Sequence, residues 1–161
     1  MIQINELALD ALQASYVEAL NTKDMAKWLA LFAQDPNASY ICTTRENVRQ
    51  DLPLALMMDD CYARLQDRVM YVTEVWAGTF QDYDTRHLTQ RLSVEWVDDN
   101  VAKFVSNVVV HYTPEEVGVS QVLCVGQYHD VVDFSSGKPL FLHKKLILDT
   151  NVLPRYLVYP L

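Results

Sequence analysis

The histidines are the side chains of this sequence best suited to chemistry, because imidazole can bind a metal or transfer a proton near neutral pH. His87, His111, His129 and His143 stand singly, each on or beside a segment with strand-like alternation. An oxygenase iron site needs two histidines and one carboxylate with open coordination positions. The scattered spacing weakens such a site without excluding it, because a fold can bring distant residues together. The sequence also contains no Gly-rich phosphate loop and no Gly-x-Ser-x-Gly nucleophile motif.

General acid–base catalysis is a second kind of chemistry, and it would require at least two polar groups that converge in a closed apolar cavity. The candidate residues for such a cavity are Tyr16, Asp67, His87 and His129. A structural role is the alternative for each of them, and we favour it. His87 would then be a hydrogen-bonded histidine at a sheet edge or a subunit contact. Asp67 would form an ion pair with Arg68 or contact a neighbouring subunit.

Strand alternation decides how the groups around His129 point. Tyr128 and Asp130 share the face opposite to His129. If the Tyr128–Asp130 face points inward, the two side chains could form a buried hydrogen bond that fixes the sheet. If His129 points inward instead, it is the better acid–base candidate. We favour the first arrangement, which is structural.

Two adjacent lysines pose a similar question. Lys144 and Lys145 point to opposite faces of their strand. We therefore expect one of them to be exposed and the other to pair with an acidic neighbour, such as Asp133 or Asp149.

The segments that must position these groups begin with helical periodicity. Leu9, Leu12, Tyr16 and Leu20 recur at helical spacing, and Asp24 is a suitable N-cap for the next helix. We expect helices over about 9–20, 25–32 and 59–72, a short strand over 39–44, and an irregular segment over 45–56.

The second half of the chain has a period of two. Leu88, Leu92, Val94 and Trp96 alternate with polar residues, which predicts a strand with this apolar set on its buried face. Gly126 interrupts a long apolar segment and indicates a bulge or bend. We expect further strands over 101–112, 119–134 and 140–149, followed by a tail over 150–161.

Helices followed by a meander of antiparallel strands predict a single α+β domain over residues 1–161. In such a domain, N-terminal helices pack on a strongly curved antiparallel or mixed sheet and give a cone-like shape. The apolar tail, which contains Arg155, Tyr156 and Tyr159, suits docking either on the domain's own sheet or on a partner.

Composition limits the partners. The 161 residues include 21 acidic and 13 basic side chains, a formal net charge of −8, which disfavours a nucleic-acid partner. No apolar run is long enough for a membrane span or a signal peptide. Three widely separated cysteines, Cys42, Cys61 and Cys124, indicate reduced and mostly buried thiols. We expect a cytoplasmic protein.

The order of elements resembles the nuclear-transport-factor-2-like (cystatin-like) fold. That fold also houses ketosteroid isomerase, scytalone dehydratase and many polyketide cyclases, so it does not choose a function by itself. A free-standing lyase or isomerase that uses His87 or Asp67 is therefore one alternative function. A small-ligand-binding or scaffold domain is another.

Local motifs are more specific, and from about residue 12 to the last residue they resemble the small (beta) subunits of aromatic-ring-hydroxylating Rieske non-haem iron dioxygenases. The similarity is greatest to the branch that acts on carboxylated rings, such as salicylate 5-hydroxylase, anthranilate dioxygenase and terephthalate dioxygenase. The matching segments are Arg45-Glu46-Asn47, Leu52-Pro53-Leu54-Ala55-Leu56, Leu65-Gln66-Asp67-Arg68-Val69, Thr85-Arg86-His87, Gly126-Gln127-Tyr128-His129-Asp130, Lys144 to Thr150, and Leu153 to Leu161.

The resemblance implies a non-catalytic subunit of an oxidoreductase. No cysteine here has a histidine two or three places later, as the family's cluster motifs require. The resemblance implies that the large (alpha) subunit carries the Rieske [2Fe-2S] cluster and the mononuclear iron. Three large and three small chains would assemble and take electrons from NAD(P)H through a reductase and sometimes a ferredoxin. The O2-dependent reaction would be a mono- or dioxygenation. Candidate subunit-interface residues are Asp67, Arg68, Arg86, Arg155, Tyr156 and Tyr159.

Overall fold

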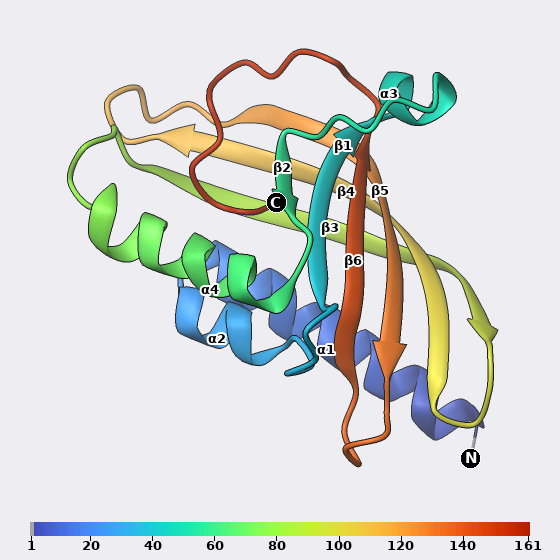
Figure 1. Cartoon of the computed structure of the whole chain (residues 1–161). Helices are drawn as coiled ribbons and strands as arrows, with labels where there is room; N and C mark the ends of the chain where they lie inside the picture. The colour runs from blue at the N-terminus through green and yellow to red at the C-terminus, as the bar shows by residue number, and fades with distance from the viewer. Residues whose placement is uncertain (1) are drawn as a thin grey trace.

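Helices pack against a curved, six-stranded mixed sheet in the computed structural model, which describes residues 2–161, with side chains from Glu6 onwards (Figure 1). The strand order is β2-β1-β6-β5-β4-β3, and only the β1–β6 pair is parallel. The elements are α1 (Ile2–Asn21), α2 (Met25–Ala30), β1 (Ser39–Thr44), α3 (Arg45–Arg49), β2 (Met57–Asp59), α4 (Tyr62–Met70), β3 (Tyr83–Trp96), β4 (Val101–Pro114), β5 (Gln121–Asp133) and β6 (Leu140–Leu148).

The N-terminal helices follow the predicted periodicity. Leu9, Leu12, Tyr16 and Leu20 are all buried on the side of α1 that faces the sheet. Asp24 caps α2, because its carboxylate accepts a hydrogen bond from the backbone N–H of Lys27 at 2.9 Å. No helix of residues 2–161 combines the length and the apolar character that crossing a bilayer demands.

The segment between β1 and α4 differs from the expectation. Residues 45–49 form α3, which Thr44 caps by accepting a hydrogen bond from Asn47 N–H at 3.2 Å. Asp59 does not start a helix; it lies in β2 and pairs with Tyr40 of β1. The predicted helix over 59–72 therefore begins at Tyr62, and it continues beyond Met70 as a π-helical turn over Tyr71–Val75.

The predicted buried face of β3 is wrong in its first half. Leu88 and Leu92 are 60% and 49% exposed, whereas Tyr83 and His87 are buried. The reason is a bulge between Arg91 and Ser93, since one extra residue moves every later side chain to the other face. After the bulge, the even-numbered residues Val94 and Trp96 pair with Phe104 and Ala102 of β4. Both of these β4 residues are buried, so the even-numbered side chains of β3 face the interior only in this second half.

Gly126 is not at a bulge. It pairs in register with Val108 and Leu148, and the irregularity of β5 lies at Leu123, between the Val110–Cys124 and His111–Val122 pairs. Gly126 is required for another reason. A Cβ at this position would lie 2.3 Å from the carbonyl oxygen of Ile147, so only glycine fits beside the neighbouring strand.

The tail packs on its own domain. It leaves β6, loops over the end of the sheet and returns toward β1 and β2 (Figure 1). Val158 and Leu161 are buried. The carbonyl oxygen of Leu161 accepts hydrogen bonds from Tyr16 Oη at 2.8 Å and Tyr40 Oη at 3.1 Å. These contacts support the self-docking alternative for the tail.

Candidate functional site

A fully buried ion pair is the most polar feature of the interior. Lys144 Nζ of β6 lies 2.7 Å from Asp130 Oδ2 of β5, and both side chains are 0% exposed. The same ammonium donates to Gln13 Oε1 of α1 at 3.0 Å. Aromatic rings surround it, with centroids 4.2, 3.9 and 4.3 Å from Nζ for Tyr16, Tyr128 and Phe141.

The register of the sheet creates this pair. Asp130 and Lys144 are directly opposite each other across β5 and β6, so their side chains share the interior face. The prediction that one lysine pairs with an acidic neighbour is therefore confirmed, but the neighbour is Asp130 and neither Asp133 nor Asp149, which were given as examples. Lys145 is the exposed member of the two lysines, as its alternation requires.

Burial shifts both pKa values of the pair toward the neutral forms. Desolvation raises the pKa of Asp130 to about 6, although attraction to the Lys144 ammonium works in the opposite direction. Desolvation lowers the pKa of Lys144 to about 8, again against the attraction of its partner. Burial therefore favours the neutral form of each group, and the attraction between the two groups favours their charged forms.

The Tyr128–Asp130 face points inward, and His129 lies exposed on the outer face. The expected hydrogen bond between Tyr128 and Asp130 is not formed, because residues two apart on a strand stand roughly 7 Å from each other. The Lys144 ammonium contacts both side chains instead, through the ring of Tyr128 and the carboxylate of Asp130.

The four residues of the alternative catalytic cavity do not converge. Tyr16 and His87 are buried in the interior, whereas Asp67 is exposed on α4 and His129 is exposed on the outer face of β5. The hydroxyl of Tyr16 is already bonded to the Leu161 carbonyl oxygen. This arrangement corrects the hypothesis that these residues line one cavity.

His87 is held in place by Asn21, the last residue of α1. Its ring Nδ1 lies 2.8 Å from Asn21 Oδ1, and the same oxygen accepts the backbone N–H of His87 at 3.2 Å. Burial, and secondarily the charge of Lys144, lowers the pKa of His87 to about 4. The imidazole on edge strand β3 is therefore neutral near pH 7, which fits the structural role considered for it.

Asp67 does not pair with Arg68. The Arg68 guanidinium donates two hydrogen bonds to the carboxylate of Asp59, both at 3.0 Å, and so ties α4 to β2. This two-point geometry is the strong form of an arginine–carboxylate contact. The ion pair between Asp67 and Arg68 that was considered from the sequence is therefore wrong.

The other candidate interface residues divide into two groups. Arg155 donates to the carbonyl oxygen of Gln81 at 2.9 Å and stacks over the ring of Tyr83, so it anchors the tail to its own domain. Tyr159 packs against Tyr83 in the same region. Arg86 and Tyr156 are exposed and face outward.

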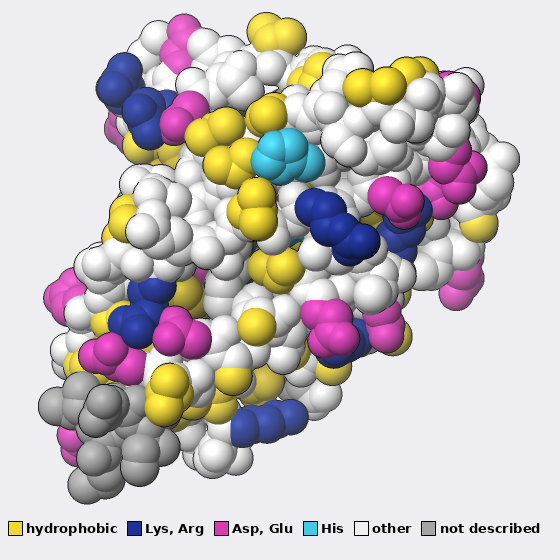
Figure 2. All heavy atoms as spheres, turned by 180° about the vertical axis from the view of Figure 1, so that it is seen from behind, with side chains coloured by type: hydrophobic (Ala, Val, Ile, Leu, Met, Phe, Trp, Pro, Cys, Tyr) yellow, Lys and Arg dark blue, Asp and Glu magenta, His cyan; other side chains and the backbone are white. Residues whose placement is uncertain are grey.

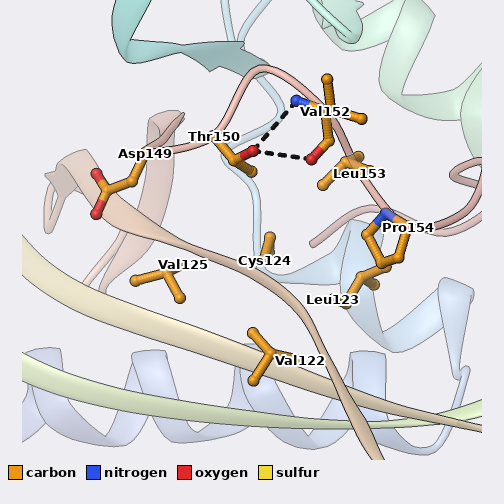
Figure 3. A pocket seen from close by; sticks show the side chains of 9 residues that line it. All are labelled: Val122, Leu123, Cys124, Val125, Asp149, Thr150, Val152, Leu153 and Pro154. Atoms are coloured by element: carbon orange, nitrogen blue, oxygen red, sulfur yellow. Dashed lines mark hydrogen bonds between the residues drawn. The ribbon is translucent and has the colours of Figure 1, made fainter.

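An apolar hollow of about 600 Å³ lies on the surface between β5 and the start of the tail (Figure 3). The Thr150 hydroxyl shapes its rim by donating to the carbonyl oxygen of Val152 and accepting that residue's N–H. Val152 is 79% exposed. The lining residues are Val122, Leu123, Cys124, Val125, Asp149, Thr150, Val152, Leu153 and Pro154.

One strand edge in this hollow has no backbone partner among residues 2–161. β6 ends at Leu148, and the hydrogen bond from Asp149 N–H to the Val125 carbonyl oxygen is the last connection on that side of β5. No backbone hydrogen bond joins residues 122–124 to the tail. This hollow could not be predicted from the sequence, because its two walls are separated along the chain and neither has a polar motif.

On the face that Figure 2 shows, several hydrophobic side chains lie together around an exposed histidine, and others are scattered among charged side chains. In the described part of the chain, no three His, Cys, Asp or Glu side chains are close enough to hold a metal ion. Cys42 and Cys124 are buried without disulfides, and desolvation raises the pKa of each to about 12.

The N-terminal helices on a curved mixed sheet place the protein in the cystatin-like, nuclear-transport-factor-2-like class. The chain belongs to the ring-hydroxylating beta subunit family, whose model matches residues 16–155. The resemblance found in the local motifs is thereby confirmed.

Named relatives agree with this family. The anthranilate 1,2-dioxygenase small subunit of Burkholderia cepacia is 27% identical over 93% of this chain and 90% of that protein. A beta subunit of the terephthalate 1,2-dioxygenase terminal oxygenase component from Comamonas sp. is 24% identical over 98% of this chain and 99% of that protein. A crystal structure from Novosphingobium aromaticivorans, described as the beta subunit of an aromatic-ring-hydroxylating dioxygenase, matches with a TM-score of 0.85 and 27% identity, over 98% and 96% of the two chains.

Proposed function

We propose that this chain is a structural subunit, which binds a catalytic large subunit and holds several of them in a ring. The observation that carries the proposal is the family match over residues 16–155, supported by relatives that are small subunits of dioxygenases. In the proposed assembly, three large and three small chains form a hexamer. The Rieske cluster and the mononuclear iron belong to the large subunit, and electrons arrive from NAD(P)H through a reductase and sometimes a ferredoxin.

The interior supports a structural role. Tyr16, Tyr128 and Phe141 pack around the ammonium of Lys144, which neutralises Asp130. A lyase or isomerase of this fold would instead need convergent polar groups around an open substrate space. The ring of His87 is hydrogen-bonded to Asn21, and Asp67 is exposed, so these two residues do not form such a group.

The surface supports a role in assembly. The hollow between β5 and the tail combines exposed apolar side chains with an unpaired strand edge, and both features become more stable when a partner covers them. Val122 and Val152 are its most exposed apolar members. We propose that the large subunit contacts this hollow, and that the outward-facing candidates Arg86, Asp67 and Tyr156 contact neighbouring chains.

The proposed substrate is a carboxylated aromatic ring, of the anthranilate, terephthalate or salicylate kind. The names of the relatives support anthranilate and terephthalate, and the resemblance of the local motifs supports salicylate. The test is turnover by the reconstituted complex of this chain, its large subunit and a reductase. Hydroxylation of anthranilate, salicylate or terephthalate in preference to naphthalene would support the proposed ring class, and preference for naphthalene would refute it.

The same reconstitution separates the structural role from a catalytic one. Omitting this chain should lower the amount of assembled, active oxygenase, while the large subunit that does assemble keeps its product pattern. A His87→Gln chain that assembles normally and yet abolishes turnover would contradict the proposal and favour a catalytic histidine.

A further inference from the structure

Several polar atoms around the buried ion pair have no hydrogen-bond partner among the described residues. They are Gln13 Nε2, Ser106 Oγ, Tyr128 Oη and Asp130 Oδ1, and each belongs to a side chain that is at most 6% exposed. Buried polar groups in folded proteins are nearly always bonded, either to protein or to ordered water. Such a group of unpartnered atoms in one place therefore indicates a bound species.

Three of these atoms belong to side chains that contact Lys144. Gln13 Oε1 and Asp130 Oδ2 both bind its ammonium, so the other atom of each group, Nε2 and Oδ1, flanks the same cation. Ser106 is the direct cross-strand neighbour of Tyr128, whose ring lies 3.9 Å from Nζ. Gln13, Tyr128 and Asp130 thus contact one ammonium between α1 and the sheet, and Ser106 lies beside Tyr128 on the neighbouring strand.

The chemistry of these atoms selects the bound species. Because Gln13 Oε1 accepts from the ammonium, its Nε2 must donate, whereas an ionised Asp130 Oδ1 can only accept. The hydroxyls of Ser106 and Tyr128 can do either. A cation would be repelled by Lys144 and an anion by Asp130, while an apolar ligand would leave all four atoms unpaired. Water satisfies every one of them, because it both donates and accepts.

We propose that Gln13, Ser106, Tyr128 and Asp130 bind one or more internal water molecules beside Lys144. One water would accept from Gln13 Nε2 and donate to Asp130 Oδ1, and the hydroxyls would complete its hydrogen bonds or bind a second water. The internal water would solvate the ion pair and so help both groups to stay charged inside an apolar core. This site is independent of the proposed contacts with a large subunit.

A high-resolution crystal structure of the full chain, alone or in its complex, tests the proposal directly. We expect density for an ordered water within hydrogen-bond distance of both Gln13 Nε2 and Asp130 Oδ1. An interior without water density, in which the Gln13 amide has rotated to bond Asp130 directly, would overturn the proposal. This result does not depend on any variant.

Oxygen-17 magnetic relaxation dispersion, which counts long-lived internal waters, gives a second test in solution. Gln13→Leu should reduce the count by at least one relative to the native chain. Gln127→Leu makes the same chemical change on the outer face, where Gln127 bonds Asn107, and should leave the count unchanged. Equal counts in the native chain and both variants would contradict the proposal.

Discussion

The interior ion pair and the surface hollow are opposite kinds of region, because one buries polar groups and the other exposes apolar groups. Inside, Lys144 and Asp130 are polar groups in an apolar place, and they are stabilised by each other, by Gln13 and by aromatic rings. On the surface, Val122 and Val152 are apolar groups exposed to water beside an unpaired strand edge. The charges of the first region are paired within the chain, and the second region is suited to a partner. Changes in the first should therefore affect folding, and changes in the second should affect assembly.

The largest expected effect follows from removing one charge of the interior pair. Lys144→Met leaves the Asp130 carboxylate buried without its cation, which should lower the free energy of unfolding by about 3–5 kcal/mol. Urea denaturation measures the change. Lys145→Met alters the adjacent, exposed lysine and should change the stability by less than about 0.5 kcal/mol.

A double substitution sharpens this prediction. Lys144→Met combined with Asp130→Leu removes both charges and should recover most of the lost stability, because the uncompensated charge is the main cost. A double variant as unstable as Lys144→Met would mean that shape, and not charge, dominates at this site.

The next largest effect is the loss of stability at acidic pH, to which we expect His87 to contribute. Its folded pKa of about 4 lies below the ordinary value, so the fold favours the neutral ring, and the unfolded chain binds more protons between pH 6.5 and 4. The contribution of His87 to the free energy of unfolding is therefore fully present above pH 6.5. It is lost as the pH falls toward 4, by up to about 3 kcal/mol.

Asp130 acts in the opposite direction within the same range. Its pKa is raised to about 6, so its contribution to stability decreases as pH rises from 4 to 6. The decisive comparison is the slope of unfolding free energy against pH, measured by urea denaturation for the native chain and for His87→Gln. The variant should lose less stability on acidification. Parallel slopes in the two chains would show that His87 does not control the acid response.

Gly126→Ala tests the close approach of two strands. The added Cβ would lie 2.3 Å from the carbonyl oxygen of Ile147, so the strands must separate locally, at a cost of about 1–3 kcal/mol. Thermal unfolding should detect the loss. An unchanged transition would indicate that β5 and β6 can shift without cost at this point.

The smallest expected effect on folding, and the most specific effect on assembly, comes from the hollow. Val152→Asp places a charge on an exposed apolar position and should change stability by less than about 0.5 kcal/mol. It should weaken binding to the large subunit by about tenfold, equivalent to about 1.4 kcal/mol. Val97→Asp is a matched control at another exposed valine, outside the hollow. Equal weakening by both variants would remove the hollow from the proposed interface.

Much of the fold was predictable because local patterns determine it. The apolar stripe of α1 and the Asp24 cap of α2 depend on neighbours within one or two turns, and both are confirmed. The buried face of β3 was not predictable from alternation, because the bulge between Arg91 and Ser93 reverses the phase without a clear sequence signal.

The site was harder to predict than the fold. Pairing Asp130 with Lys144 requires the register of β5 on β6, which no single segment encodes. A signal was nevertheless present, since Asp130 lies in phase with the apolar residues Tyr128 and Val132 and so had to be a buried charge in need of a partner. The hollow gave no comparable signal, because the tail and β5 meet only in the folded chain.

The central claim is that this chain serves as a structural subunit, and the most direct test is the mass and iron content of its complex. The chain should be co-expressed with its large subunit, recognised by the Cys-x-His and Cys-x-x-His ligand pairs, and measured by light scattering and metal analysis. We expect a particle of three large and three small chains, with iron that is absent when this chain is purified alone. A particle that contains only this chain, with no large subunit bound, would contradict it.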